Sequence, residues 1–143
     1  MNKKIFHSNP SSGNLLIRLM VGGVFFTEGI QKLMFPAAMA AGRFTQIGIP
    51  SPEFFGLFVG YTEIICGFLL LIGLITRIAA IPLLIDIVVA IYTTKIPILM
   101  HKGFWSAIHE ARTDLCMLLG LIFLLSLGSG KWSFDNKISK GKS

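Results

Sequence analysis

The stretch FFGLFVGYTEIICGFLLLIGLI, from Phe54 to Ile75, decides the fold class. It runs for 22 residues and contains a single charged side chain, Glu63. A membrane-spanning helix needs about 20 mainly apolar residues. The stretch follows Pro52, and proline suits the first turn of a helix. These features predict a transmembrane helix.

Further apolar runs lie on both sides of this stretch. One extends from Leu15 to Phe35, and a run from Ile78 to about Ile96 follows the central stretch so closely that the two should form a tight hairpin. The last pure apolar run is short unless its helix begins near His109. We predict helices at about 15–35, 54–75, 78–96 and 109–128. The segments 37–53 and 97–108 are expected as connections, the first with a short interfacial helix.

The composition supports a membrane protein. Of the 143 residues, 53% are hydrophobic and 14% are charged, and the mean hydropathy is +0.73. A soluble domain has about a quarter of its residues charged. The apolar run that follows Lys3 and Lys4 is too long for a signal peptide, which predicts an uncleaved first helix. We predict an all-α, integral membrane four-helix bundle that forms one domain over residues 1–143, with lipid around it.

The net charge of +6 indicates an orientation in the membrane. The lysines cluster at the two ends of the chain and do not alternate with aromatics on an amphipathic element, so a nucleic-acid partner is not predicted. The positive-inside rule predicts a multi-pass protein of the bacterial cytoplasmic (inner) membrane with both termini in the cytoplasm. The residues on the more basic side are Lys3, Lys4, Arg18, Arg77, Lys131, Lys137, Lys140 and Lys142, against Lys32, Arg43, Lys95, Lys102 and Arg112 on the other.

Ionisable side chains within the predicted helices are candidates for a polar pocket. Each costs roughly 2.5–3.5 kcal/mol at the centre of a membrane helix, so each needs a partner or a function. The helical rise places Glu63 and Asp86 near the midplane, with the others between the midplane and the outer surface. The candidate pocket residues are Glu28, Lys32, Glu63, Asp86, Arg112 and Asp114.

Small residues share a face with Glu63. Gly56, Gly60, Glu63 and Gly67 are separated by four, three and four residues, which places them on one stripe of a helix. Glycines at this spacing allow two membrane helices to approach closely. We therefore predict helix packing at Gly56, Gly60 and Gly67.

The charged residues support two interpretations, with a proton or ion path as a third. They could be structural pairs, Glu28 with Lys32 and Glu63 or Asp86 with Arg112, with Lys32 as a second possible base beside Glu63. They could instead line a pocket for a small polar or redox-active molecule.

Two other features are expected to carry no chemistry. The histidines show no HxxxH or HExxH spacing, and no metal site is predicted. Cys66 and Cys116 lie at different predicted depths, which predicts two packing residues without a disulfide.

Four elements of the sequence resemble the DoxX family. They are Glu28-Gly29-x-x-Lys32-Leu33, Glu63 with the downstream Thr76-Arg77, His101-x-Gly103-Phe104, and Gly128-x-Gly130-x-x-Ser133-x-Asp135. The resemblance implies a small four-helix bacterial membrane protein. Some relatives are associated with redox systems, such as a thiosulfate:quinone oxidoreductase subunit or a membrane partner of thiol-handling proteins.

The functional expectation is a membrane subunit or partner of a redox system that uses a quinone or a sulfur or thiol compound. The sequence has no haem, flavin or iron–sulfur signature, so no cofactor is encoded, no catalytic residue is assigned, and any enzymatic activity would be that of a non-autonomous oxidoreductase subunit. A quinone and a redox protein partner are the implied ligand and partner, and a homo-oligomer is compatible with the sequence. The alternative is a non-catalytic scaffold or assembly factor, and a small transporter is a weaker alternative because no inverted repeat is found.

Overall fold

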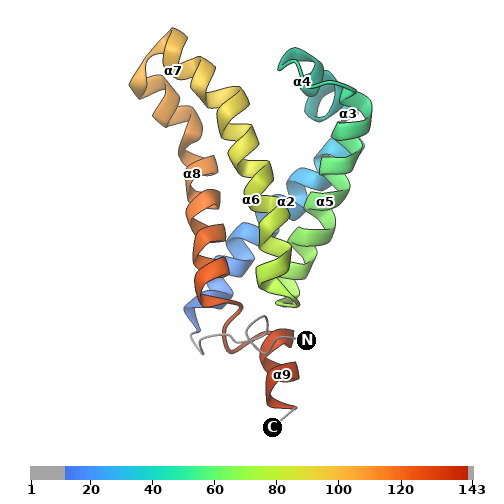
Figure 1. The fold of residues 1–143 in the computed structure, drawn as a ribbon, viewed down its shortest axis with the longest axis vertical. Helices are drawn as coiled ribbons and strands as arrows, with labels where there is room; N and C mark the ends of the chain where they lie inside the picture. Colours follow the sequence, from blue (N-terminus) through green and yellow to red (C-terminus); the bar gives the residue numbers. More distant parts are fainter. Residues whose placement is uncertain (1–11, 142–143) are drawn as a thin grey trace.

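A computed structural model describes residues 12–141, and these residues form helices without any strand. Figure 1 shows longer helices joined by short ones. The longer helices are α2 (Gly13–Met34), α5 (Pro52–Ile72), α6 (Thr76–Ala90) and α8 (Phe104–Leu127). The short elements are α3 (Pro36–Met39), α4 (Ala41–Gln46), the π-helix η1 (Ile91–Lys95), α7 (Ile96–Lys102) and α9 (Phe134–Lys140).

The longer helices form two pairs that spread apart along the molecule (Figure 1). Helix α2 runs along α5, and α6 packs against α8. The pairs separate toward the end that carries α3, α4 and α7, which we call the diverging end. They meet at the end that carries α9, the converging end. A core of aliphatic side chains, including Val21, Leu70, Leu83 and Leu121, joins all four helices.

Within the described residues, three helical stretches are long and apolar enough to cross a membrane: Gly13–Met34, Pro52–Ile72 and Thr76–Lys102. Many large apolar side chains on them are exposed, as expected of surfaces that face lipid. The all-helical prediction is therefore confirmed, and the three apolar stretches are consistent with a multi-pass membrane protein. Helix α8 is not among these stretches, because charged residues occupy its first half.

The predicted connection at 97–108 is wrong. The third stretch continues as helix to Lys102, and α8 begins at Phe104 rather than near His109. Only Gly103 separates the two helices, with φ of +85°, a backbone conformation that glycine adopts without penalty. Proline in a helix interior usually kinks or breaks the helix, and for that reason Pro97 suggests a helix end at Ile96.

A π-helical turn explains how the helix continues past Pro97. Proline clashes with the carbonyl group four residues before it and cannot donate to it. The wider turn Ile91–Lys95 directly precedes this position, and Pro97 lies in the first turn of α7. The hydroxyls of Thr93 and Thr94 donate hydrogen bonds to backbone carbonyls of the preceding turn. These carbonyls therefore have hydrogen-bond partners.

The predicted interfacial helix between α2 and α5 is two short helices, α3 and α4. They fold back toward the start of α5, where Ala40 is buried against Gly56. A Cβ atom added at Gly56 would lie 2.9 Å from the methyl group of Ala40. The glycine therefore allows this segment to cover the first turns of α5.

Glycines also bring α2 and α5 close together. An added Cβ at Gly67 would lie 2.7 Å from the amide nitrogen of Phe26, and one at Gly29 would lie 2.6 Å from the carbonyl oxygen of Gly60. Gly56, Gly60 and Gly67 are all buried. The predicted stripe is thus a contact surface, on which Gly60 and Gly67 face α2.

Arg18 ties the converging end together. Its side chain is 2% exposed, and the guanidinium donates to four carbonyl oxygens. Two belong to Leu70 and Leu71 in the last turn of α5, at 3.0 and 3.1 Å. The other two belong to Ser129 and Trp132, at 3.0 and 2.7 Å, in the segment after α8. One side chain of α2 therefore fixes the ends of two other elements.

Asp135 fixes the turn between α5 and α6. Its carboxylate accepts hydrogen bonds from the backbone amides of Ile75 (2.6 Å) and Thr76 (3.0 Å), which are free at the start of α6. Ile75 has φ of +44°, an unfavourable conformation for a β-branched residue. The carboxylate thus stabilises a strained turn that determines how α6 leaves α5.

We expect Gly67→Ala to weaken the packing of α2 against α5. The added methyl group would press on the backbone of Phe26, and overpacking of this kind costs about 1–3 kcal/mol. Gly23→Ala is the matched control, because a Cβ at Gly23 meets no atom within 4 Å. Thermal unfolding in a mild detergent measures both variants. Equal stabilities of the two variants would show that α2 and α5 are not in close contact.

Candidate functional site

The centre of the candidate site is the ammonium group of Lys32. It donates to both carboxylate oxygens of Glu63, at 2.7 and 2.9 Å. Lys32 lies near the end of α2 and Glu63 in the middle of α5, and the Glu63 side chain is only 3% exposed. A second carboxylate, that of Glu28, lies 3.8 Å from the same ammonium one turn earlier on α2.

Asp86 brings helix α6 into this group. Its carboxyl lies close enough to that of Glu63 for the two to interact, and it lies within the electrostatic range of Lys32, Glu28 and Asp114. We call Glu28, Lys32, Glu63 and Asp86 the carboxylate cluster. It contains three acids and one base.

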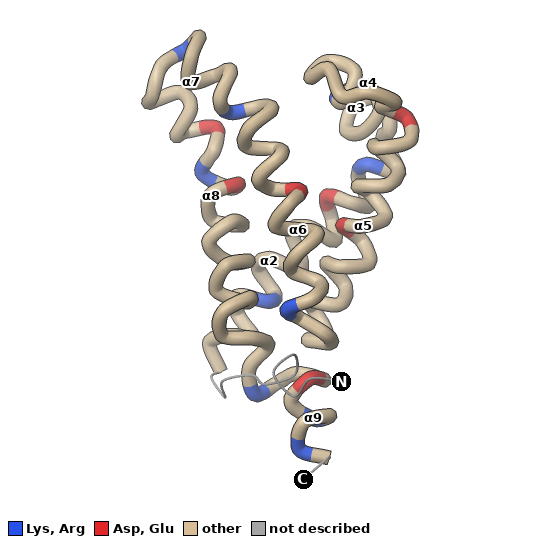
Figure 2. The backbone as a smooth tube through the Cα atoms, viewed as in Figure 1, with Lys and Arg blue, Asp and Glu red and all other residues tan. Residues whose placement is uncertain are grey.

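Figure 2 shows charged residues on both helix pairs in the part of the molecule where the pairs spread apart. On the second pair, Lys95 of η1 and Asp114 of α8 form an ion pair at 3.2 Å. Both side chains are mostly buried, at 14% and 22% exposure. Asp86 interacts electrostatically with Asp114, so the carboxylate cluster and this ion pair belong to one polar region.

Arg112 does not join the other predicted pocket residues. It is exposed, and its guanidinium contacts Nδ1 of His109 at 3.3 Å. The interpretation that paired Glu63 or Asp86 with Arg112 is therefore wrong, since Lys32 is the base beside Glu63. One helical turn separates Glu28 from Lys32, and that predicted pair is present.

Sequence reasoning overlooked Lys95 as a site residue. It lies just before Pro97 and was expected at a helix end on the outer side. The π-helical turn instead keeps it inside a continuous helix, where it faces α8. Its spacing from Asp86 gave no signal, because an α-helical register does not hold through a π turn.

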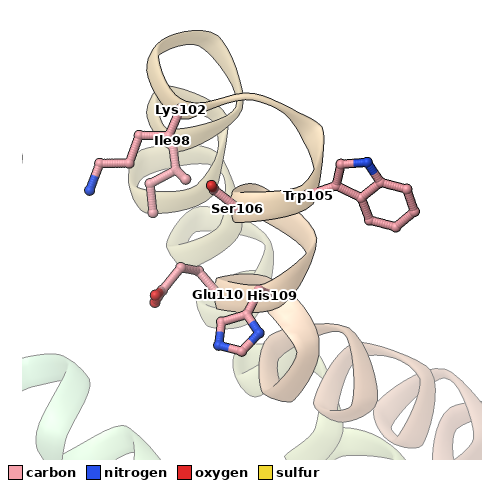
Figure 3. A pocket seen from close by; sticks show the side chains of 6 residues that line it. All are labelled: Ile98, Lys102, Trp105, Ser106, His109 and Glu110. Carbon is pink, nitrogen blue, oxygen red and sulfur yellow. The ribbon is translucent and has the colours of Figure 1, made fainter.

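An open pocket of about 630 Å³ lies at the α7–α8 hairpin of the diverging end. Figure 3 shows the Lys102 and Glu110 side chains extending to the same side, with His109 below them and Trp105 directed away. These side chains are exposed, so water or lipid headgroups reach them. The pocket is separate from the carboxylate cluster and shares no residue with it.

The remaining candidate groups offer little chemistry. Among residues 12–141, no group of three or more His, Cys, Asp or Glu side chains has the arrangement of a metal site. Cys66 is buried in the core and Cys116 is exposed, and both are free thiols. The polar region thus combines carboxylates and amines inside an apolar protein, an arrangement suited to hydrogen bonding and proton exchange.

A family model described as DoxX matches residues 13–96. The chain belongs to the DoxX family. The matched residues of this DoxX protein include the whole carboxylate cluster. The motif from Gly128 to Asp135, which builds the converging end, lies outside the residues matched by the family model.

Two relatives extend the comparison over almost the whole DoxX chain. An uncharacterized membrane protein of Mycobacterium tuberculosis is 51% identical over 96% of this chain and 88% of its own length. A Bacillus subtilis protein, named "Putative oxidoreductase CatD", is 32% identical over 91% of this chain and 90% of its own. No solved structure matches the chain.

A double-mutant cycle tests the contact between Lys32 and Glu63. We expect Lys32→Met to be strongly destabilising, by about 3–5 kcal/mol, because it leaves buried carboxylates without a base. Combining it with Glu63→Gln should recover part of the loss, a coupling of about 1–3 kcal/mol. Thermal unfolding in detergent provides the measurement.

The pair Lys95 and Asp114 gives the matched control for this cycle. It is more exposed than Lys32 and Glu63, so the same analysis of Lys95→Met and Asp114→Asn should yield a smaller coupling. Strictly additive effects at Lys32 and Glu63 would contradict the ion pair.

Proposed function

We propose that this DoxX-family protein is the membrane subunit of an oxidoreductase system, and that the carboxylate cluster binds a lipid-soluble quinone. The observation that carries this proposal is the surplus of acids around Lys32 inside membrane-spanning helices. A purely structural pair needs one acid for one base, whereas this cluster holds three acids. Such a surplus suits a site that exchanges protons with a ligand.

The donor set of the cluster fits a quinone. A quinone, when bound, takes up two electrons and two protons. Lys32 supplies N–H donors for a carbonyl oxygen, and Glu28, which is 43% exposed, provides a carboxyl that a ligand from the bilayer can reach. The neighbouring carboxyls of Asp86 and Glu63 can share one proton, which would then be available for transfer to a ligand.

The electrons come from a partner protein in this proposal. The sequence has no signature of an electron-carrying group, and the two cysteines differ in burial. A thiol or another reduced sulfur compound, oxidised on the partner, is the electron donor. The relative CatD carries the name "Putative oxidoreductase", which supports the proposal of a redox role.

A second function, a non-catalytic scaffold, is favoured by the contact between Lys32 and Glu63. Both carboxylate oxygens bind the ammonium, and such a closed pair can fix helix order without binding a ligand. The two functions differ at Asp86 and Glu28, which a scaffold does not require as acids.

Quinone binding distinguishes these two functions. We expect Asp86→Asn to lower quinone affinity about tenfold, or about 1.4 kcal/mol, because it removes the proton-exchanging carboxyl. The protein is purified from quinone-containing membranes, and the retained quinone is quantified by mass spectrometry and by titration in nanodiscs. Glu53→Gln, which changes an exposed acid in the first turn of α5, is the control. If the unsubstituted protein retains no quinone, the quinone proposal is wrong and the scaffold function is favoured.

We also propose that α8 is a fourth membrane crossing and that both ends of the chain are cytoplasmic. At 24 residues α8 is about 36 Å long, enough to cross the hydrocarbon core of about 30 Å. It lies beside α6, and Asp114, one of its charged residues, is paired with Lys95. The basic residues of the converging end support a cytoplasmic location. Lys3, Lys4 and Lys142, which contributed to the predicted orientation, lie outside the described residues.

Reporter fusions test this topology. A reporter that is active only in the periplasm should be active after Gly103 and inactive after Gly141, because α8 separates these positions. A fusion after Thr45 should behave like the one after Gly103, since both positions lie at the diverging end. Reporter activity after both Gly103 and Gly141 would show that α8 does not cross the membrane.

A further inference from the structure

The surface at the converging end combines exposed lysines with exposed aromatic rings. Trp132 is 70% exposed and Phe134 is 50% exposed, although both follow the apolar helix α8 directly. Lys131 and Lys137 are exposed beside them, and the ammonium of Lys137 lies 5.5 Å from the centre of the Phe134 ring. We call Lys131, Trp132, Phe134 and Lys137 the basic–aromatic surface.

Acidic side chains do not neutralise this surface. In the sequence, residues 1–27 contain no Asp or Glu, and residues 115–143 contain only Asp135. The Asp135 carboxylate is 2% exposed and accepts the amides of Ile75 and Thr76. Its charge also lies near Arg18, a buried cation. The local acid is therefore used inside the protein, and the exposed charge at this end is positive.

The position of the surface relative to the bilayer is set by the turn beside it. The amide of Asp135 donates to the carbonyl of Gly73, immediately after the last residue of α5. Phe134 and Trp132 thus lie at the level where the spanning helices α5 and α6 end and begin. Tryptophan and lysine are both favoured at this depth, where rings meet the acyl boundary and ammonium groups meet phosphates.

We propose that the basic–aromatic surface binds the headgroups of anionic phospholipids in the adjacent leaflet. Lys131 and Lys137 contact the phosphate and the negatively charged headgroup, while Trp132 and Phe134 enter the boundary between headgroups and acyl chains. Basic residues next to a membrane helix attract anionic lipids through this combination of charge and proximity. The site is independent of the carboxylate cluster and of any redox function.

Trp132 itself reports the bound lipid. The chain has two tryptophans, Trp105 and Trp132, so the Trp105→Phe variant leaves Trp132 as the single indole fluorophore. This full-length variant is placed in phosphatidylcholine nanodiscs that contain a minor fraction of phosphatidylglycerol. Bromine atoms are attached to the acyl chains of one lipid or the other in parallel samples. We expect brominated phosphatidylglycerol to quench Trp132 about twofold more than its share of the lipid predicts.

Two changes should abolish this enrichment. Lys131→Gln combined with Lys137→Gln removes the charges, and salt at about 1 M, with a Debye length of about 3 Å, screens them. Lys102→Gln, an exposed lysine at the diverging end, is the control and should leave the quenching unchanged. Equal quenching by the two brominated lipids would overturn the proposal, as would enrichment that survives the double substitution. If the double variant fails to accumulate, the salt series on the parent decides the question.

Discussion

The buried guanidinium of Arg18 is the interaction on which the arrangement of the helices depends. It donates to two carbonyl groups at the end of α5, where Leu70 also accepts from the amide of Gly73, and to two in the segment after α8. Arg18 is 2% exposed, so these carbonyls lie away from water, and each one left without a donor would cost several kcal/mol. The cation also lies at the negative end of the α5 dipole. Gly73 is required here, because a Cβ would lie 2.5 Å from a guanidinium nitrogen.

The two ends of the helix bundle are held together by different interactions. At the converging end, Arg18 and Asp135 connect α2, α5, α6 and the segment after α8. Toward the diverging end, contacts between helices include Lys32 with Glu63 and Lys95 with Asp114. Each ion pair lies within one helix pair, and Asp86 is the ionisable residue that faces from one pair to the other. The polar region therefore lies where the two helix pairs spread apart.

Much of the fold could be predicted from the sequence, because length and hydropathy are local properties. The starts of α2 and α5 differ from the predicted ones by two residues, and the glycine stripe on α5 is a packing surface. The path through Pro97 could not be predicted, since it depends on a π turn. The role of Arg18 was also missed. In the sequence Arg18 indicates only the orientation in the membrane. Its hydrogen-bond partners lie more than 50 residues away, and the spacing of residues along the chain does not identify them.

Within the candidate site, helical spacing placed Glu28, Lys32, Glu63 and Asp86 at compatible depths, and they do meet. Spacing gives depth and face for each helix separately, but not the rotation of one helix against another. That rotation decides which base approaches Glu63, and it selects Lys32 while Arg112 stays exposed. The sequence alone therefore leaves Arg112 and Lys32 open as partners of Glu63 and cannot decide between them.

The π turn has a consequence for comparing this chain with its relatives. Its hydrogen bonds span five residues instead of four, so it accommodates one residue more than a regular turn. Every residue after Lys95 is therefore displaced around the helix axis from the position that α6 would give it. A relative without the extra residue would present a different face of α7 to α8, even with matching amino acids. The family model's match ends at residue 96, directly after this turn. Alignments of α7 and α8 across the family should therefore be anchored on Gly103 and not extended from α6.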